Sequence, residues 1–222
     1  MSMPIQLDRR LTRPIQPLPG GPAQGLALLR ARMHEICGPA RAALAAMVME
    51  RCEGPVLWVF PGWLPERVYP DGLAEFTDPA RLIMACARRP EDILWAVEEG
   101  LRSGAVPLVV AELPTPPALT PVRRLNLAAE AGADAAHHWH RIAPLGLLLI
   151  PGDGGAQGSE SRWHMDFAPS RSSLIERHQA WTLSRRRARD RPPADWHITR
   201  DEDGRTEVSP ASGADAPSPP VT

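Results

Sequence analysis

Lysine is missing from this chain of 222 residues, whose 25 basic residues are all arginine and are balanced by 26 acidic residues. The formal net charge of −1 gives no bulk electrostatic attraction to nucleic acid or to an anionic membrane. No apolar run approaches the roughly 20 residues that a membrane-spanning helix needs, and the N-terminal residues lack the apolar core of a signal peptide. We therefore expect a cytoplasmic protein that does not bind membranes.

Cysteine is scarce as well. Cys37, Cys52 and Cys86 show no C-x-x-C spacing, which predicts buried, reduced thiols rather than disulfides or a metal site. The other candidate metal ligands are the histidines of residues 137–140, with Asp134 nearby. A structural zinc site needs four ligands that converge from two elements, and no second set is present. We predict no metal site.

The most informative stretch is residues 31–62. Residues 33–37 are predicted to form a strand, Gly38 and Pro39 a turn, residues 39–51 a helix, and the wholly apolar residues 56–60 a second, buried strand. A strand, a glycine turn, a helix and a strand form the frame in which a phosphate-binding loop of pattern G-x-x-x-x-G-K-[ST] occurs.

That loop needs a flexible backbone around the phosphates, a lysine on their charge and a hydroxyl on Mg²⁺. When the pattern starts at Gly38, Ala43 takes the place of the second glycine, Leu44 of the lysine and Ala45 of the hydroxyl residue. We interpret the stretch as the frame of a nucleotide site without its chemistry, and predict neither a nucleotide cofactor nor catalysis. A βαβ unit that never bound phosphate fits the spacing equally well.

The remaining pattern alternates helices with apolar strands, which predicts an α/β fold with a mostly parallel sheet flanked by helices. Asp78 and Pro79 are expected to open a helix with Leu82, Ile83 and Cys86 on its apolar face. Further expected helices cover residues 91–103 and 120–131, buried strands cover 106–113 and 145–150, and antiparallel edge strands cover 162–168, 180–187 and 196–199. The predicted organisation is an extended arm (1–25), one domain (26–200) and a disordered acidic tail (201–222).

Two surface features are candidate binding sites, each with an alternative. A basic run is suited to the phosphates of a DNA strand or, alternatively, to a solvated strand edge that resists aggregation; it consists of Arg185, Arg186, Arg187, Arg189 and Arg191. Aromatic and apolar residues around a proline-flanked turn are suited to binding a partner protein or to covering the end of the sheet; they are Trp63, Leu64, Tyr69 and Phe76.

Several segments carry a family resemblance. Residues 31–47 resemble the strand, phosphate loop and helix of RecA, and residues 102–112 resemble the end of a helix and the Walker B strand of RecA. Together with HEICGPA, GPVLWVFPGWLPE, YPDGL, PLVVAELP and SRWHM, they make residues 25–200 similar to the ImuA-type, RecA-like proteins of bacterial SOS mutagenesis.

The resemblance implies a RecA-like fold with a Walker B-like acid at Glu112, as a structural acid or a remnant Mg²⁺ ligand. It places Gly62 where RecA has its catalytic glutamate. It further implies a non-catalytic accessory protein that bridges an inactive, ImuB-type Y-family-like polymerase subunit and an error-prone DNA polymerase III alpha-type subunit in translesion synthesis. The alternatives are a SulA-like cell-division inhibitor that binds the bacterial tubulin homologue, and a working NTPase, which Leu44 disfavours.

Overall fold

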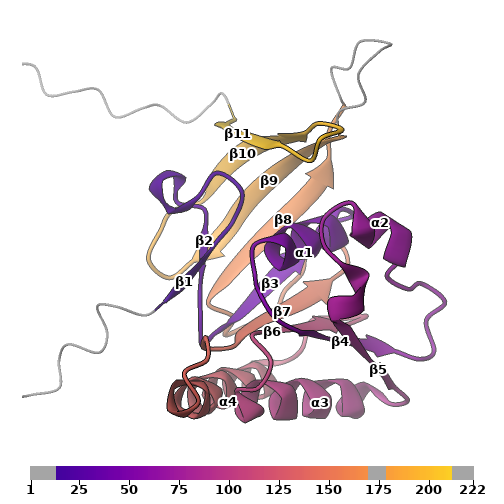
Figure 1. The fold of residues 1–222 in the computed structure, drawn as a ribbon, viewed down its shortest axis with the longest axis vertical. Coiled ribbons are helices and arrows are strands. Elements are labelled where there is room, and N and C mark those ends of the chain that lie inside the picture. Colours follow the sequence, from indigo (N-terminus) through magenta and orange to yellow (C-terminus); the bar gives the residue numbers. More distant parts are fainter. Residues whose placement is uncertain (1–13, 170–178, 212–222) are drawn as a thin grey trace, which may run out of the picture.

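A computed structural model describes residues 14–169 and 179–211. A nine-stranded sheet has the order β11-β10-β9-β8-β3-β7-β6-β4-β5, and a separate hairpin pairs β1 with β2 (Figure 1). The strands are β1 (Ile15–Pro17), β2 (Ala27–Leu29), β3 (Met33–Cys37), β4 (Val56–Pro61), β5 (Leu82–Ala87), β6 (Leu108–Glu112), β7 (Leu145–Ile150), β8 (Ser161–Phe167), β9 (Gln179–Ala188), β10 (Ala194–Arg200) and β11 (Thr206–Pro210). The helices are α1 (Arg41–Glu50), α2 (Pro70–Ala74), α3 (Pro90–Ser103) and α4 (Leu119–His138), with 3-10 turns at Pro22–Gln24 and Pro79–Arg81.

The direction of the strands divides this sheet into two parts. The six strands from β8 to β5 run parallel to their neighbours, and β8 to β11 pair antiparallel. Such parallel strands are covered on both faces, which is why β3 and β7 are buried along their whole length. The predicted fold class is confirmed, and the arrangement is compatible with a RecA-like fold.

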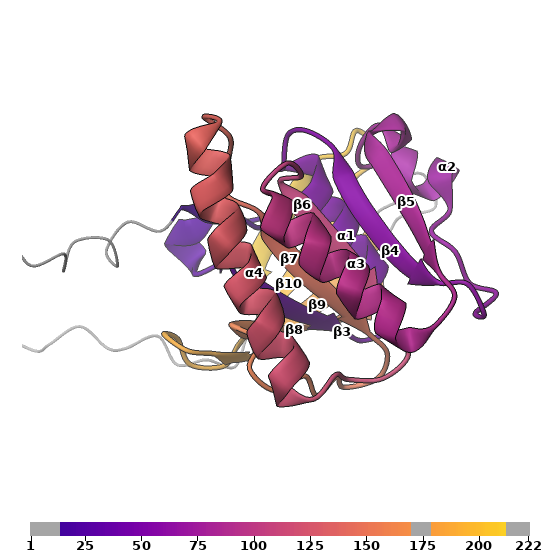
Figure 2. The same cartoon turned by 90° about the horizontal axis from the view of Figure 1, so that it is seen from below.

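Helices cover the parallel strands on opposite faces. Helices α3 and α4 lie side by side on one face, and α1 lies on the other (Figures 1 and 2). The apolar core is therefore double, with Trp58, Leu44 and Trp163 in the layer under α1, and Val109 and Leu148 in the layer under α3 and α4.

A glycine allows α3 and α4 to approach closely. A Cβ atom added at Gly132 of α4 would lie 1.8 Å from the backbone oxygen of Leu101 of α3, far inside van der Waals contact. Glu98 of α3 also accepts hydrogen bonds from Arg102 and, across the helix pair, from Arg124. The close packing of α4 against α3 thus requires glycine at position 132.

The prediction of a helix after Asp78 is wrong. Only the 3-10 turn Pro79–Arg81 forms, with the Asp78 side chain as its cap, and residues 82–87 form strand β5 instead. A six-residue apolar run satisfies either element, and here the open edge of β4 supplies backbone partners along its full length.

The expected domain limits also differ from the structure at both ends. Strand β1 pairs with β2 and Leu18 is fully buried, so the described part of the expected arm, residues 14–25, belongs to the fold. Strand β11 extends the sheet through residue 210, within the expected tail. At the N-terminal end the buried side chain of Leu18 holds the segment in the core. At the C-terminal end β11 is held by its backbone pairing with β10. Composition indicated neither contact. Residues 1–13 and 212–222 lie outside the described residues.

Candidate functional site

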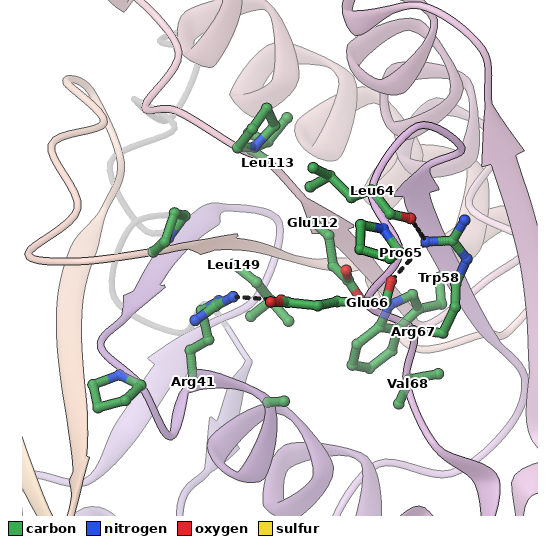
Figure 3. A pocket seen from close by; sticks show the side chains of 14 residues that line it. Arg41, Trp58, Leu64, Pro65, Glu66, Arg67, Val68, Glu112, Leu113 and Leu149 are labelled. Carbon is green, nitrogen blue, oxygen red and sulfur yellow. Dashed lines mark hydrogen bonds and ion pairs between the residues drawn. The ribbon is translucent and has the colours of Figure 1, made fainter.

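A cleft of about 680 Å³ lies at the carboxyl ends of β4, β6 and β7 (Figure 3). In open α/β sheets this end of parallel strands is where ligands bind. The strands contribute Trp58, Glu112 and Leu149, the start of α1 contributes Arg41, and the segment 64–68 forms the opposite wall. The cleft is the candidate functional site.

The turn at residues 38–40, between β3 and α1, borders this cleft and has the place of a phosphate loop. Its backbone amides are already bonded: Gly38 N–H donates to the carbonyl of Gly152 (N to O, 2.8 Å) and Ala40 N–H to that of Met165 (3.1 Å). Gly38 has φ +90°, and an added Cβ atom would lie 2.4 Å from the Met165 oxygen. A phosphate loop requires such amides to point at the ligand, whereas these two point at protein carbonyls.

The structure places Ala43, Leu44 and Ala45 in helix α1, which begins at Arg41, within the helix predicted for residues 39–51. Leu44 and Ala45 are fully buried in the core under α1, and Ala43 packs against it. The turn between strand and helix is therefore only three residues long, and position 44 points into the protein.

Glu112 is the last residue of strand β6 and lines the cleft. Its Oε1 accepts a hydrogen bond from Trp58 Nε1 at 2.6 Å. Burial raises the pKa of the Glu112 carboxyl, and the Trp58 bond and the charges of Arg41 and Arg67 oppose that rise. Within the part of the chain that the structure describes, no basic side chain forms an ion pair with this carboxylate.

The charged residues at the mouth of the cleft contact one another or the backbone. Arg41 and Glu66 approach to 3.9 Å across the opening (Figure 3). Arg67 donates to the carbonyls of Leu64 and Glu66, and its guanidinium lies 4.7 Å from the centre of the Phe60 ring. These contacts keep the segment 64–68 folded over the cleft.

The expected partner-binding residues divide into two groups. Leu64 lines the cleft, while Trp63 and Tyr69, on the same loop, are 43% and 68% exposed. Phe76 instead packs against the core and lies beneath the guanidinium of Arg200, 4.6 Å from the centre of its ring. Only the first three are placed to contact a partner.

Arg185, the first residue of the basic run, is a core residue. It is buried, donates to the carbonyls of Gly25 (2.8 Å) and Pro192 (3.0 Å), and lies over the rings of Trp163 and Trp196 at 5.6 and 5.1 Å. Burial lowers the pKa of its guanidinium. Arg185 therefore joins β9 to β8, β10 and the N-terminal hairpin, and is not available to DNA.

The other four arginines of the run lie at the surface, and three of them contact nearby oxygen atoms. Arg187 donates to the carbonyl and the hydroxyl oxygen of Ser159, and Arg189 lies 3.5 Å from the Glu160 carboxylate. All four of these arginines, Arg186, Arg187, Arg189 and Arg191, are exposed, and Arg191 lies 3.6 Å from the carboxylate of Asp190. A DNA contact at this edge remains a prediction that rests on fewer residues than the sequence suggests.

Sequence reasoning missed a buried charge at Glu35 of β3. Its carboxylate is fully buried, forms an ion pair with Arg162 (Nε to Oε2, 2.6 Å) and accepts hydrogen bonds from the amides of Gly155 and Ala156. A Cβ atom at Gly154 would lie 2.2 Å from Oε1, so the glycine-rich loop after β7 is shaped around this carboxylate. Its signal in the sequence is a His-Glu pair inside an otherwise apolar strand.

His34 is buried beside it and has a defined tautomer. Nε2 lies 2.9 Å from the carbonyl of Leu29, which only accepts, so Nε2 carries the proton. Nδ1 then accepts from the Ser161 hydroxyl at 2.6 Å, and that oxygen accepts from Trp163 Nε1 at 2.7 Å. Burial lowers the pKa of His34 to about 4.

The cysteines are free, as expected, but only two are buried: Cys86 lies exposed on the edge strand β5. Burial, with the Glu35 charge second, raises the pKa of Cys37 to about 11. Over residues 14–169 and 179–211, no three His, Cys, Asp or Glu side chains are grouped so as to hold a metal ion.

No helix in those same two ranges combines the length and the apolar character needed to cross a bilayer. Comparison of the chain with models of protein families gives no match, and comparison with curated proteins gives none.

Proposed function

We propose that this chain is a non-catalytic accessory protein of SOS-induced, error-prone translesion synthesis. In this proposal it bridges an ImuB-type, Y-family-like polymerase subunit and an error-prone DNA polymerase III alpha-type subunit. The names of the partners come from the resemblance of residues 25–200 to ImuA-type proteins.

The single observation that carries the non-catalytic part is the bonding at the turn after β3. Phosphoryl transfer depends on groups that position and neutralise the phosphates. Here the amides of Gly38 and Ala40 are bonded to protein carbonyls, and Leu44 is buried. A nucleotide would have to break these contacts before it gained any of its own.

The cleft and its rim support the binding part of the proposal. Exposed aromatic residues beside a concave, partly apolar surface are typical of the few residues that dominate binding energy at protein interfaces. Trp63, Leu64 and Tyr69 have this placement, because the loop after β4 carries them past the end of the sheet.

The test is co-purification of the tagged chain from damage-treated bacterial cells, with the two polymerase subunits and the tubulin homologue followed by mass spectrometry. We expect the polymerase subunits, and we expect Trp63→Ala to reduce their recovery. The matched control is Trp95→Ala, which removes another exposed tryptophan from α3, away from the cleft. Recovery of the tubulin homologue without the polymerase subunits would support the SulA-like alternative and contradict the proposal.

A further inference from the structure

The floor of the cleft holds Glu112, an acid that forms no ion pair with a basic side chain of the described residues. Glu112 is half-buried, and its Oε1 accepts a hydrogen bond from the indole N–H of Trp58. Removing a carboxylate from water without a cation is unfavourable. The raised pKa of this carboxyl reports the same penalty.

The nearby cations are committed to other contacts. Arg41 donates to the carbonyl of Gly38 at 3.2 Å and approaches Glu66 at the rim. Arg67 is held by backbone carbonyls of its own loop and by the Phe60 ring. Both arginines are close enough to attract the Glu112 charge, yet neither forms an ion pair with it.

The walls between this carboxylate and the mouth are largely apolar. They include Leu64, Pro65 and Val68 from the segment after β4, and Leu113 and Pro114 from the segment after β6. Long basic side chains bury their methylene stems against such surfaces and place the charged group at the end. An apolar passage that ends at a carboxylate matches that shape and charge.

We propose that the cleft receives a basic side chain, arginine or lysine, from a segment of a partner protein, and that Glu112 forms the ion pair with its charged group. This proposal rests on the proposed function, because it specifies the chemistry of the partner segment. The guanidinium or ammonium group meets Glu112 while Trp58 keeps its hydrogen bond to Oε1. The stem of the side chain lies against Leu64 and Pro114.

The indole N–H of Trp58 gives a direct readout, because it donates to the proposed acceptor. The full chain is labelled with ¹⁵N, the signal is assigned through Trp58→Phe, and N-acetyl-argininamide is titrated as the probe. N-acetyl-citrullinamide, of nearly the same shape but uncharged, is the matched ligand control. We expect a saturable shift of the Trp58 signal with the arginine compound and none with the citrulline compound.

Glu112→Gln keeps an acceptor for Trp58 and removes the charge. We expect the argininamide to bind this variant about tenfold more weakly or not at all. Equal shifts with the two compounds, no shift with either, or unchanged affinity in the variant would overturn the proposal. If the wild-type chain still co-purifies with the polymerase subunits while argininamide fails to bind, this inference fails and the proposed function stands.

Discussion

Acid should destabilise this fold through His34. The side chain is buried, with Nε2 bonded to the carbonyl of Leu29 and Nδ1 to the hydroxyl of Ser161, and burial disfavours its charged form. Its pKa falls from 6.5 to about 4 on folding. Between these values the unfolded chain binds the proton and the folded chain does not. The contribution of His34 to stability is therefore complete above pH 6.5 and is lost as the pH falls toward 4.

The size of the effect follows from that difference. At about 1.4 kcal/mol for each unit of pKa, the fall in the pKa of His34 corresponds to a loss of about 3 kcal/mol of unfolding free energy when the pH drops from above 6.5 to below 4. Between about pH 7 and about pH 4.5 the loss is about 2.5 kcal/mol. That is a large share of the stability of a typical domain.

Urea denaturation followed by tryptophan fluorescence measures this loss as the change in unfolding free energy with pH. His34→Gln keeps an N–H for Leu29 and cannot titrate, so its unfolding free energy should vary less with pH by about 2.5 kcal/mol over the same range. His197→Gln, at an exposed position of β10, should keep the wild-type dependence. An unchanged pH dependence in His34→Gln would refute the reasoning.

Three further predictions concern stability and use the same denaturation assay. Arg185→Ala should lower the unfolding free energy by about 3 kcal/mol, because it leaves two carbonyls and two tryptophan faces without their partner. Arg186→Ala, at an exposed position, should change it by less than about 0.5 kcal/mol. Equal effects of the two substitutions would contradict the buried position of Arg185. Gly132→Ala should cost about 1–3 kcal/mol, because its Cβ atom would push α4 from α3, and a neutral result would contradict that close contact. Leu44→Lys should cost several kcal/mol by burying an ammonium group, and calorimetry should detect no restored ATP binding; tight binding would show that position 44 faces a phosphate site.

The sheet was predictable from the sequence because its central strands are apolar along their length. A strand such as β7, which is buried on both faces, does not alternate apolar with polar residues, so its sequence is not mistaken for that of a strand with one face in water. The run LIMACA of β5 was misread because six apolar residues fit one face of a helix as well as a strand. Only the open edge of β4, a tertiary feature, decides between the two.

The candidate site was predictable only in part. Glu112 and the loop carrying Trp63 could be placed from the ends of predicted strands. The bonding of Gly38 to Gly152 and of Ala40 to Met165 joins segments more than 100 residues apart, and no local pattern reveals it. The burial of Arg185 could not be predicted locally either, because the residue stands among other arginines in the sequence. In β9 its side chain lies on the buried face of the strand.

The central claim is that the turn after β3 is occupied by the protein itself, and the amide signals of Gly38 and Ala40 test it most directly. In ¹⁵N-labelled chain, we predict that both amides exchange slowly with solvent and that neither signal moves when millimolar ATP and Mg²⁺ are added. Fast exchange of both amides, with saturable shifts on addition of ATP, would show an open phosphate-binding turn and contradict the account.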